Sequence, residues 1–370
     1  MPASLKLSAL AVAVAATAAL ASCSTGGGSS SPPPVSSSPA SASTLKQQAQ
    51  REHGLVIYAN APAQYFQPLI TAFNKQYPFI KVSAADLSDN VVFSKYEAEA
   101  AQGARTADLL IASAPASWVQ AEQNGVSAGV TPAGLSTFPS WVNQGHGVFV
   151  MSAEPVLTTY NAKLLTSSQV PRTWAQLAAD AKADPARYKL VSYTIGNPLN
   201  YGGIYGLIHV LGAGKVWSYY DDMAPVTKTF EDGLTGLAYM LQGAASVGYM
   251  SSGLAQGVLP HYKGLASYTF MQDATPLIPR AITVTKNAAS PASAQLFLDF
   301  LYTQAGQVAL CTAGFEATMT NFHPANGCTA SLTALQSHVP ANTIYLVPID
   351  QAVLDQQTAI TQRWNQAFHR

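Results

Sequence analysis

Residues 55–82 read LVIYANAPAQYFQPLITAFNKQYPFIKV, and the order of patterns in this stretch decides the fold class. Its first five residues form an apolar run that predicts a buried strand, and residues 80–84 predict a second strand. Between the two lies a stripe of apolar residues at helical spacing, which stops at Pro78 and consists of Phe66, Leu69, Ile70, Phe73 and Tyr77. A strand, a helix and a strand in succession are typical of a parallel α/β sheet.

Strands and helices continue to alternate toward the C-terminus. Further strands are expected at residues 108–112, 156–160, 190–194, 246–250, 266–270 and 281–285. Further helices are expected at residues 91–102, 115–124, 172–181 and 201–211, from Pro291 onward, and at 350–368. The body of the protein is therefore predicted to be an α/β structure that begins near residue 52.

Composition limits the possible partners. Hydrophobic residues make up 48% of the 370 residues, which is enough to bury a sizeable core. Only 10% of residues are charged, and 19 basic side chains balance 19 acidic ones, so the formal net charge is zero. A surface that binds nucleic acid needs a surplus of Lys and Arg, so the composition argues against nucleic acid as a partner.

The N-terminal segment, residues 1–22, has the features of a bacterial signal peptide. Lys6 is its only charge, and the apolar run at residues 7–20 is too short to span a bilayer. The run ends in Leu20-Ala21-Ser22-Cys23, which resembles the lipobox of bacterial lipoproteins, where the cysteine takes lipid chains such as palmitate. We expect cleavage before Cys23 and lipidation of its sulfur; an ordinary secretory signal with a chance cysteine is the alternative.

Residues 23–51 are predicted to tether the body to this lipid anchor. Of the 21 residues from 24 to 44, 18 are Ser, Thr, Gly or Pro, and none is charged. Such a segment cannot bury an apolar face and stays solvated. We therefore expect an exported protein that is anchored to the periplasmic or cell-surface side of a membrane.

Cys311 and Cys328 lie 17 residues apart, with no other cysteine nearby. An exported protein can join such a pair in a disulfide, and two unpaired thiols are the alternative. A zinc site with His323 is less favoured, because two Cys and one His lack a fourth ligand. The other histidines are scattered without metal-ligand spacing, so neither a metal nor a cofactor is expected.

Five segments in order resemble the extracellular solute-binding proteins of ABC importers, in the ferric-binding-like branch of family 1, the type II periplasmic binding proteins. The likeness extends from about residue 52 to the helix that contains Trp364. The segments are residues 55–82, TADLLIASAPASWVQAEQNG at 106–125, Tyr160-Asn161 with VPRTWAQL at 170–177, QDATPLIP at 272–279, and AITVTKNAASPASAQLFLDFLYTQAGQ at 281–307.

The resemblance implies an α/β fold of two lobes with two hinge crossings and a ligand cleft between the lobes. We place the crossings near residues 153–160 and 277–284. The first lobe is then residues 52–155 plus 281–330, the second lobe is 156–280, and 331–370 form a C-terminal helical segment. The implied function is that of a monomer, without enzymatic activity, which captures a small-molecule ligand and delivers it to an ABC permease with its ATPase.

Ligands of open α/β sheets bind beyond the carboxyl ends of the strands, where helix N-termini present unpaired N–H groups. The loops at these positions supply the candidates Asn60, Ala61, Ser88, Asn90, Ser113, Ala114 and Asn197. The aromatic residues Tyr65 and Tyr201 are further candidates, and the resemblance adds Tyr249 and Asp273. The alternatives are capping or turn chemistry for the polar residues, core packing for the aromatic ones, and capping of the hinge turn for Asp273.

The loops expected at the cleft hold no Lys or Arg, and several helix N-termini are expected there. Such termini favour negative or dipolar groups, so we expect an organic anion such as a phosphonate, sugar phosphate or carboxylate. A polyamine held by Asp273, Tyr65 and Tyr201 is the main rival. Ferric iron is disfavoured: the ferric members of the family use a Tyr-Tyr pair, and only Tyr249 matches it.

Other functions have weaker support. A ligand sensor for a membrane receptor could use the same fold. The sequence GVSAG at 125–129 fits a G-x-S-x-G motif, but a helix is expected before it instead of a strand, so no nucleophile elbow is predicted. No other pattern indicates catalysis.

Overall fold

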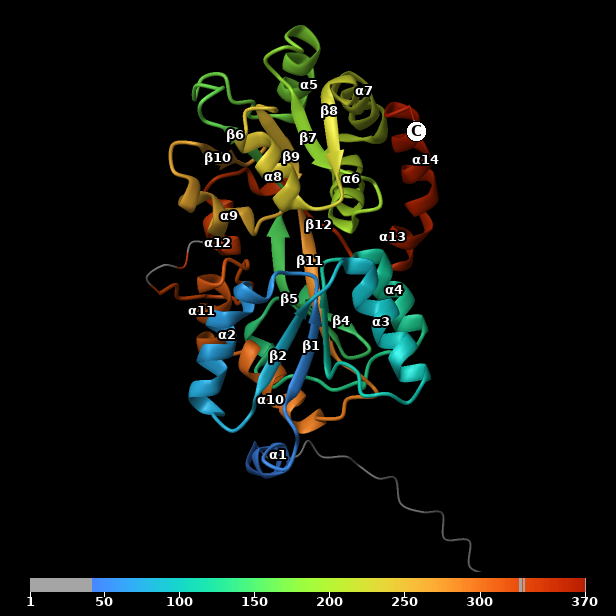
Figure 1. The fold of residues 1–370 in the computed structure, drawn as a ribbon, viewed down its shortest axis with the longest axis vertical. Coiled ribbons are helices and arrows are strands. Elements are labelled where there is room, and N and C mark those ends of the chain that lie inside the picture. The colour runs from blue at the N-terminus through green and yellow to red at the C-terminus, as the bar shows by residue number, and fades with distance from the viewer. Residues whose placement is uncertain (1–41, 326–327, 329, 370) are drawn as a thin grey trace, which may run out of the picture. The chain divides into compact units, whose positions relative to one another are not determined.

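The computed structural model describes residues 42–325, 328 and 330–369. Residues Ser41–Arg370 form one compact unit (Figure 1). The predicted signal peptide, Cys23 and most of the predicted tether lie outside the described residues. Within the described part of the chain, no helix is both long enough and apolar enough to cross a membrane.

Seven strands of the described chain form the first sheet, in the order β2-β1-β3-β11-β5-β4, with β12 also paired to β11. Strands β1, β2 and β3 are parallel, whereas β11 runs antiparallel to β3 and to β5, so the sheet is mixed. The strands are β1 (Leu55–Ala59), β2 (Val82–Asp86), β3 (Leu109–Ala112), β4 (Asn143–Gly145), β5 (Val148–Pro155), β11 (Thr275–Val284) and β12 (Ile344–Leu346).

Helices cover both faces of this sheet because its inner strands are apolar on both sides. In β1, Ile57 packs into one core and Tyr58 into another, as the alternation of side chains along a strand requires. The first core contains residues of α2 (Ala63–Gln76), α10 (Pro291–Leu301) and α11 (Gln304–Thr312). The second contains residues of α3 (Asp89–Ala101) and α4 (Pro115–Gln123). Helix α1 (Ala42–Ala49) packs against α10.

The second sheet has five strands in the order β10-β6-β9-β7-β8. Strand β7 is parallel to β8 and β9, and β6 is antiparallel to β9 and β10. The strands are β6 (Leu157–Asn161), β7 (Leu190–Tyr193), β8 (Thr227–Phe230), β9 (Val247–Ser251) and β10 (Ala266–Thr269). The helices of this part are α5 (Trp174–Ala183), α6 (Pro198–Leu211), α7 (Ala213–Met223), α8 (Gly233–Leu241) and α9 (Ala255–Val258).

Two connections join the sheets. Strand β5 runs directly into β6, with only Val156 between them, inside the predicted first crossing. The return path runs through residues 270–274, between β10 and β11. The predicted second crossing at 277–284 was wrong by a few residues: all of it lies inside β11, which is paired with β5 and β3 within the first sheet.

The C-terminal segment contacts both parts of the molecule. The helix predicted at 350–368 is divided into α13 (Gln351–Asp355) and α14 (Gln357–Ala367), and α12 (Leu332–Gln336) precedes them. Helix α13 packs against α4, beside the first sheet, whereas α14 packs against α6 and α7, beside the second. Trp364 of α14 is buried in the core of the second part.

A disulfide joins Cys311, near the end of α11, to Cys328. We predict that replacing both cysteines by alanine lowers the free energy of unfolding by about 3 kcal/mol, because the bond closes a loop of 17 residues in the unfolded chain. Urea denaturation of the oxidised protein measures this loss. As a control, a reducing agent should destabilise the wild type similarly and leave the variant unchanged. Equal stability of both proteins without the reducing agent would contradict the prediction.

Candidate ligand-binding site

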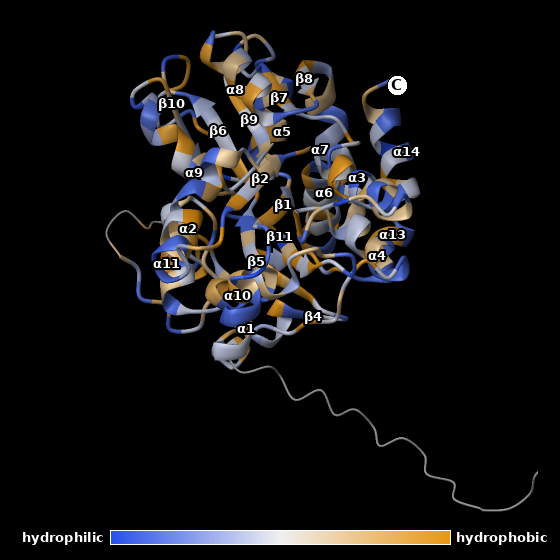
Figure 2. Cartoon of the chain, turned by 60° about the horizontal axis from the view of Figure 1, so that its bottom comes forward, coloured by the Kyte–Doolittle hydropathy of each residue, from blue (hydrophilic) through white to orange (hydrophobic). Residues whose placement is uncertain are grey.

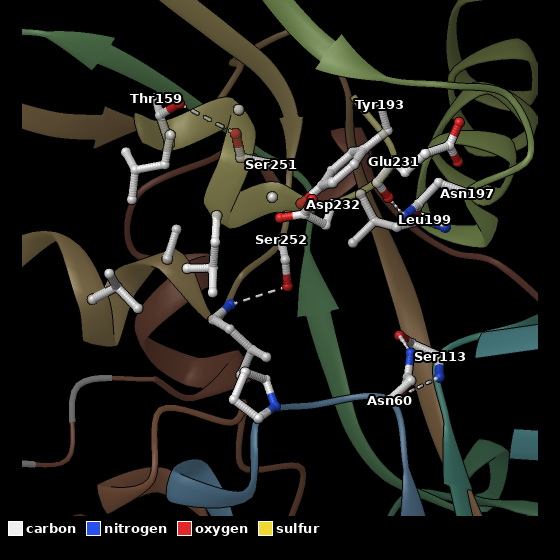
Figure 3. A pocket seen from close by; sticks show the side chains of 18 of the residues that line it. Asn60, Ser113, Thr159, Tyr193, Asn197, Leu199, Glu231, Asp232, Ser251 and Ser252 are labelled. Atoms are coloured by element: carbon white, nitrogen blue, oxygen red, sulfur yellow. Dashed lines mark hydrogen bonds between the residues drawn. The ribbon is translucent and has the colours of Figure 1, made fainter. Parts of the chain in front are cut away.

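A cavity of about 580 Å³ lies between the carboxyl ends of strands from the two sheets. The first sheet and the loops after its strands contribute Asn60, Pro62, Tyr65, Asp86, Leu87, Ser88, Ser113 and Arg280. The second sheet and its loops contribute the polar residues Thr159, Tyr193, Asn197, Glu231, Asp232, Ser251 and Ser252 (Figure 3). Ser192 and Tyr249 of the same sheet also line the cavity. The cavity size is within the range of small-molecule sites.

The local sequence explains why these side chains meet. In the first sheet, parallel pairing aligns Ala59 with Asp86 and Ile111, so β1, β2 and β3 end at the same edge. The residues that follow begin helices α2, α3 and α4. In the second sheet, β7 and β8 likewise lead into α6 and α8, whose first turns are capped by Asn197 and Asp232. Helix N-termini from both sheets therefore face the cavity.

Six predicted residues line the cavity: Asn60, Tyr65, Ser88, Ser113, Asn197 and Tyr249. Asn60 and Ser113 bind one another, because Asn60 Nδ2 donates to Ser113 Oγ at 2.9 Å and Ser113 N donates to Asn60 Oδ1 at 3.2 Å. Asn197 accepts from Leu199 N at 3.0 Å and donates to the Glu231 carbonyl at 3.1 Å. Asn60 and Asn197 are thus held in fixed orientations at the cavity wall.

The phenol of Tyr249 points into the protein core. Its ring packs edge-on against Trp174 and Tyr220, and its hydroxyl donates to Thr227 Oγ1 at 3.2 Å. Its carbonyl accepts from Ser192 Oγ at 3.2 Å at the cavity wall. Burial raises the pKa of Tyr249. The predicted role of this phenolate as a ligand group is therefore not supported.

Of the predicted residues whose side chains the structure describes, four do not line the cavity. Ala61 and Ala114 are buried in the cores on the two faces of the first sheet. Tyr201 is buried in the second part, where its hydroxyl donates to the Val353 carbonyl and burial raises its pKa. It therefore fixes α6 to the C-terminal segment, which is the alternative interpretation of core packing. Asn90 lies in α3, and its side chain is outside the described part of the structure.

Asp273 is the fourth predicted residue that does not line the cavity. Both of its carboxylate oxygens accept from Trp174 N at 3.0 Å, and Oδ2 also accepts from Ala175 N at 3.4 Å. The Thr173 side chain accepts from Gln176 N at 3.0 Å, so these two residues satisfy the first N–H groups of α5. A carboxylate at a helix N-terminus is also favoured by the helix dipole. Asp273 therefore caps α5 at the second crossing.

Arg280 is an important cavity residue that was not predicted from the sequence, because only the loops after the strands were considered. It lies within β11 and is 2% exposed, yet it borders the cavity. Its Nε donates to Glu154 Oε1 at 3.0 Å, and its Nη1 donates to the Asn60 carbonyl at 3.2 Å and to Asn60 Oδ1. The guanidinium also lies over the Phe315 ring at 5.4 Å. The loops at the cavity hold no Lys or Arg, as expected, and this cation comes from a strand instead.

Two buried carboxyl groups lie near Arg280. Glu154 Oε1 accepts from Ser152 as well as from Arg280, and its Oε2 has no partner among the described residues. Glu316 accepts a hydrogen bond from Gln256 of α9 at 3.3 Å. Burial, with a smaller contribution from the negative charge of Glu154, raises the pKa of Glu316 to about 8. Glu316 is therefore mostly neutral at pH 7, and the charge of Glu154 balances that of Arg280.

Among the described residues, no group of three or more His, Cys, Asp and Glu side chains could hold a metal ion. Three carboxylates do line the cavity, those of Asp86, Glu231 and Asp232. Asp232 caps α8 by accepting from Thr235 N at 2.8 Å, and Glu231 accepts from Thr194 Oγ1 at 2.9 Å. Asp232 and Glu231 are thus engaged within the second lobe.

The model of the bacterial extracellular solute-binding protein family matches residues 59–308 of the chain. The protein therefore belongs to this family, whose members are exported transport components and not enzymes. No curated protein matches the chain.

Solved structures show the same fold. A substrate-binding protein of an ABC transporter from Agrobacterium tumefaciens is similar, with a TM-score of 0.75 and 20% identity, covering 86% of this chain and 96% of that one. AfuA from Actinobacillus pleuropneumoniae, with bound fructose-6-phosphate, has a TM-score of 0.69 and 16% identity over 85% and 98% of the two chains. Iron-bound HitA from Pseudomonas aeruginosa has a TM-score of 0.68 and 15% identity over 85% and 99%.

Protonation of Glu316 predicts a dependence of stability on pH. Its pKa of about 8 in the folded protein lies above its ordinary value near 4.5, so its contribution to stability is fully present below pH 4.5 and is lost as pH rises through 8. Between pH 4.5 and pH 8, the wild type should lose up to about 1.4 kcal/mol of unfolding free energy per pH unit relative to Glu316→Gln. Urea denaturation at pH 5 and pH 8 measures the difference.

The glutamine variant keeps an oxygen acceptor for Gln256, and Glu97→Gln on the exposed side of α3 is the matched control. The control should follow the pH dependence of the wild type. If Glu316→Gln followed it as well, Glu316 would be ionised in the folded protein and the prediction would be contradicted.

Proposed function

We propose that this protein captures a small organic anion in the cavity between its two sheets and delivers it to the permease of an ABC importer. The observation that carries the proposal is the buried guanidinium of Arg280 at the cavity wall. The N-termini of α3, α4, α6 and α8 begin at or next to other residues that line the cavity, and they favour negative charge in the same place. Carboxylates, phosphonates and sugar phosphates belong to this class of ligand.

Capture depends on groups from both lobes, the first built on the seven-stranded sheet that contains β11 and the second on the five-stranded sheet. The first lobe offers Asn60, Ser113 and Arg280, and the second offers Ser251 and Ser252. A solute that contacts both sets stabilises their closed arrangement over any open one. The protein acts as a monomer, and the closed complex is the form that the permease and its ATPase receive.

Two other ligand classes have weaker support. Ferric iron would need several anionic oxygen ligands, but the Tyr249 phenol is in the core and no metal-binding cluster occurs among the described residues. A polyamine would use Glu231, Asp232 and Asp86, because Asp273 and Tyr201 do not line the cavity.

A sensor role for a membrane receptor remains the second candidate function, and a permease gene next to this one would favour transport.

Variants of the Arg280–Glu154 pair test the ligand charge. The double variant Arg280→Gln/Glu154→Gln removes both charges, so neither is left buried alone. We expect it to lose affinity for the organic anion at least tenfold, because a hydrogen bond to a charged group contributes about 1.5–3 kcal/mol. Glu154→Gln alone keeps the cation but leaves it buried without its partner, so we expect a lower unfolding free energy and, in the folded protein, anion binding as tight as in the wild type or tighter. Calorimetry with phosphonates, sugar phosphates, carboxylates, spermidine and Fe(III) measures these affinities.

The matched control is Arg105→Gln, which changes an exposed arginine of the first lobe outside the cavity. Micromolar binding of spermidine without a response to any anion would contradict the proposal. Tight Fe(III) binding with a phenolate charge-transfer band would contradict it too.

Lipid anchoring through Cys23 is part of the same proposal. Cys23 lies in the N-terminal segment before the folded unit, so Cys23→Ala should release the protein from the membrane without changing its thermal unfolding. Membrane fractionation and circular dichroism measure the two effects. Persistent membrane association of the variant after signal cleavage would count against lipidation at Cys23.

A further inference from the structure

One wall of the cavity is apolar. It is formed by β7, α8, α9 and residues next to them, which contribute Val191, Leu234, Leu237, Met240, Leu254, Ala255, Val258 and Leu259. Val191, Met240 and Leu259 belong to one small buried cluster of the second lobe, and Leu237 and Ala255 pack against it. The wall is therefore the outer surface of a packed core.

Helix α8 supplies three of these eight side chains, those of Leu234, Leu237 and Met240, and has an unusual composition for its position. Its sequence, GLTGLAYML, contains no charged residue, and Figure 2 shows apolar residues along it. Gly236 and Met240 are its buried residues, whereas Leu234 at the cavity rim is 58% exposed. A surface helix normally turns a polar face to water, and a helix that is apolar all round is buried against something. An apolar part of the bound solute would cover this surface.

Arg280 is the only cation among the described residues that line the cavity. Arg280 uses Nε and Nη1 for Glu154 and Asn60, and Nη2 has no hydrogen-bond partner among the described residues. The positive charge of Arg280 is balanced by Glu154, and Glu231 and Asp232 add negative charge to the other wall. Together with Asp86, these carboxylates repel any anion in the cavity, and they repel a doubly charged phosphate about twice as strongly as a singly charged carboxylate.

We propose that the solute is a monocarboxylate with an apolar body, its carboxylate at Arg280 and its body on the wall formed by α8 and α9. This inference rests on the proposed capture of an organic anion and narrows it. Asn60 accepts from the guanidinium and also binds Ser113, shortly before the start of α4. The apolar wall selects for the body, because each methylene removed from water adds a fixed increment of binding free energy.

Isothermal calorimetry with the straight-chain series acetate, butyrate, hexanoate and octanoate tests the inference. Affinity should rise about fourfold per methylene until the chain fills the wall. The heat-capacity change of binding should become more negative along the series. The methyl ester of octanoate, which has no charge, should bind at least tenfold more weakly than octanoate.

Leu237→Gln tests the wall, because Leu237 is half-buried and faces the cavity. It should weaken octanoate several-fold and leave acetate unchanged. Leu265→Gln is the matched control: Leu265 is another exposed leucine of the second lobe, 46% exposed and outside the cavity. This control should leave the affinity for octanoate unchanged.

Fructose-6-phosphate and glycerol-3-phosphate are the comparison ligands. If either bound more tightly than every carboxylate and lost affinity in Arg280→Gln/Glu154→Gln, the monocarboxylate inference would be overturned while the proposed capture of an anion stood. An affinity independent of chain length would also overturn it. Binding of spermidine or Fe(III) alone would overturn both.

Discussion

The pairing of Arg280 with Glu154 between the neighbouring strands β11 and β5 of the first sheet is the interaction on which the site depends. Strands β5 and β11 lie side by side, with Arg280 opposite Ser152 and Glu154 opposite Ile278, and both charged residues are almost fully buried. Removing either partner would leave an uncompensated charge in the interior, which costs several kcal/mol. The same guanidinium holds Asn60 at the end of β1, so the register of the connecting strands also sets the position of the first ligand-facing loop.

Further contacts join the two lobes around this pair. Gln256 of α9 donates to the buried Glu316 of the first lobe, and the backbones of Gly257 and Gly314 lie close together. On the side of α13, Leu354 packs against the cores of both lobes. The C-terminal segment is therefore shared by both lobes and is not a separate helical appendage. Any opening of the cavity must break or bend these contacts.

Much of the architecture follows from the sequence because α/β alternation leaves strong local signals. Strand β1 has the predicted bounds, and the polar loops after β1, β3 and β7 do face the cavity. The direction in which side chains point could not be predicted from the sequence. Tyr249 and Tyr201 point into cores, and Asp273 caps α5. Arg280 was missed because loops alone were searched for charge. Its signal was a single cation in the apolar run TPLIPRAITV, where an arginine must have a partner.

The chemistry of the cavity follows from what the two lobes provide. The first lobe supplies a preorganised cation, both lobes supply helix N-termini, and the second adds apolar surface with hydroxyl and carboxylate groups beside it. A crystal structure of the protein with the solute that it retains on purification from its own cells tests this account most directly. The account predicts a carboxylate or other anionic group within about 3 Å of the Arg280 guanidinium, with the rest of the solute against α8. A solute whose charged group is a cation beside Glu231 and Asp232, or a bound iron ion, would contradict it.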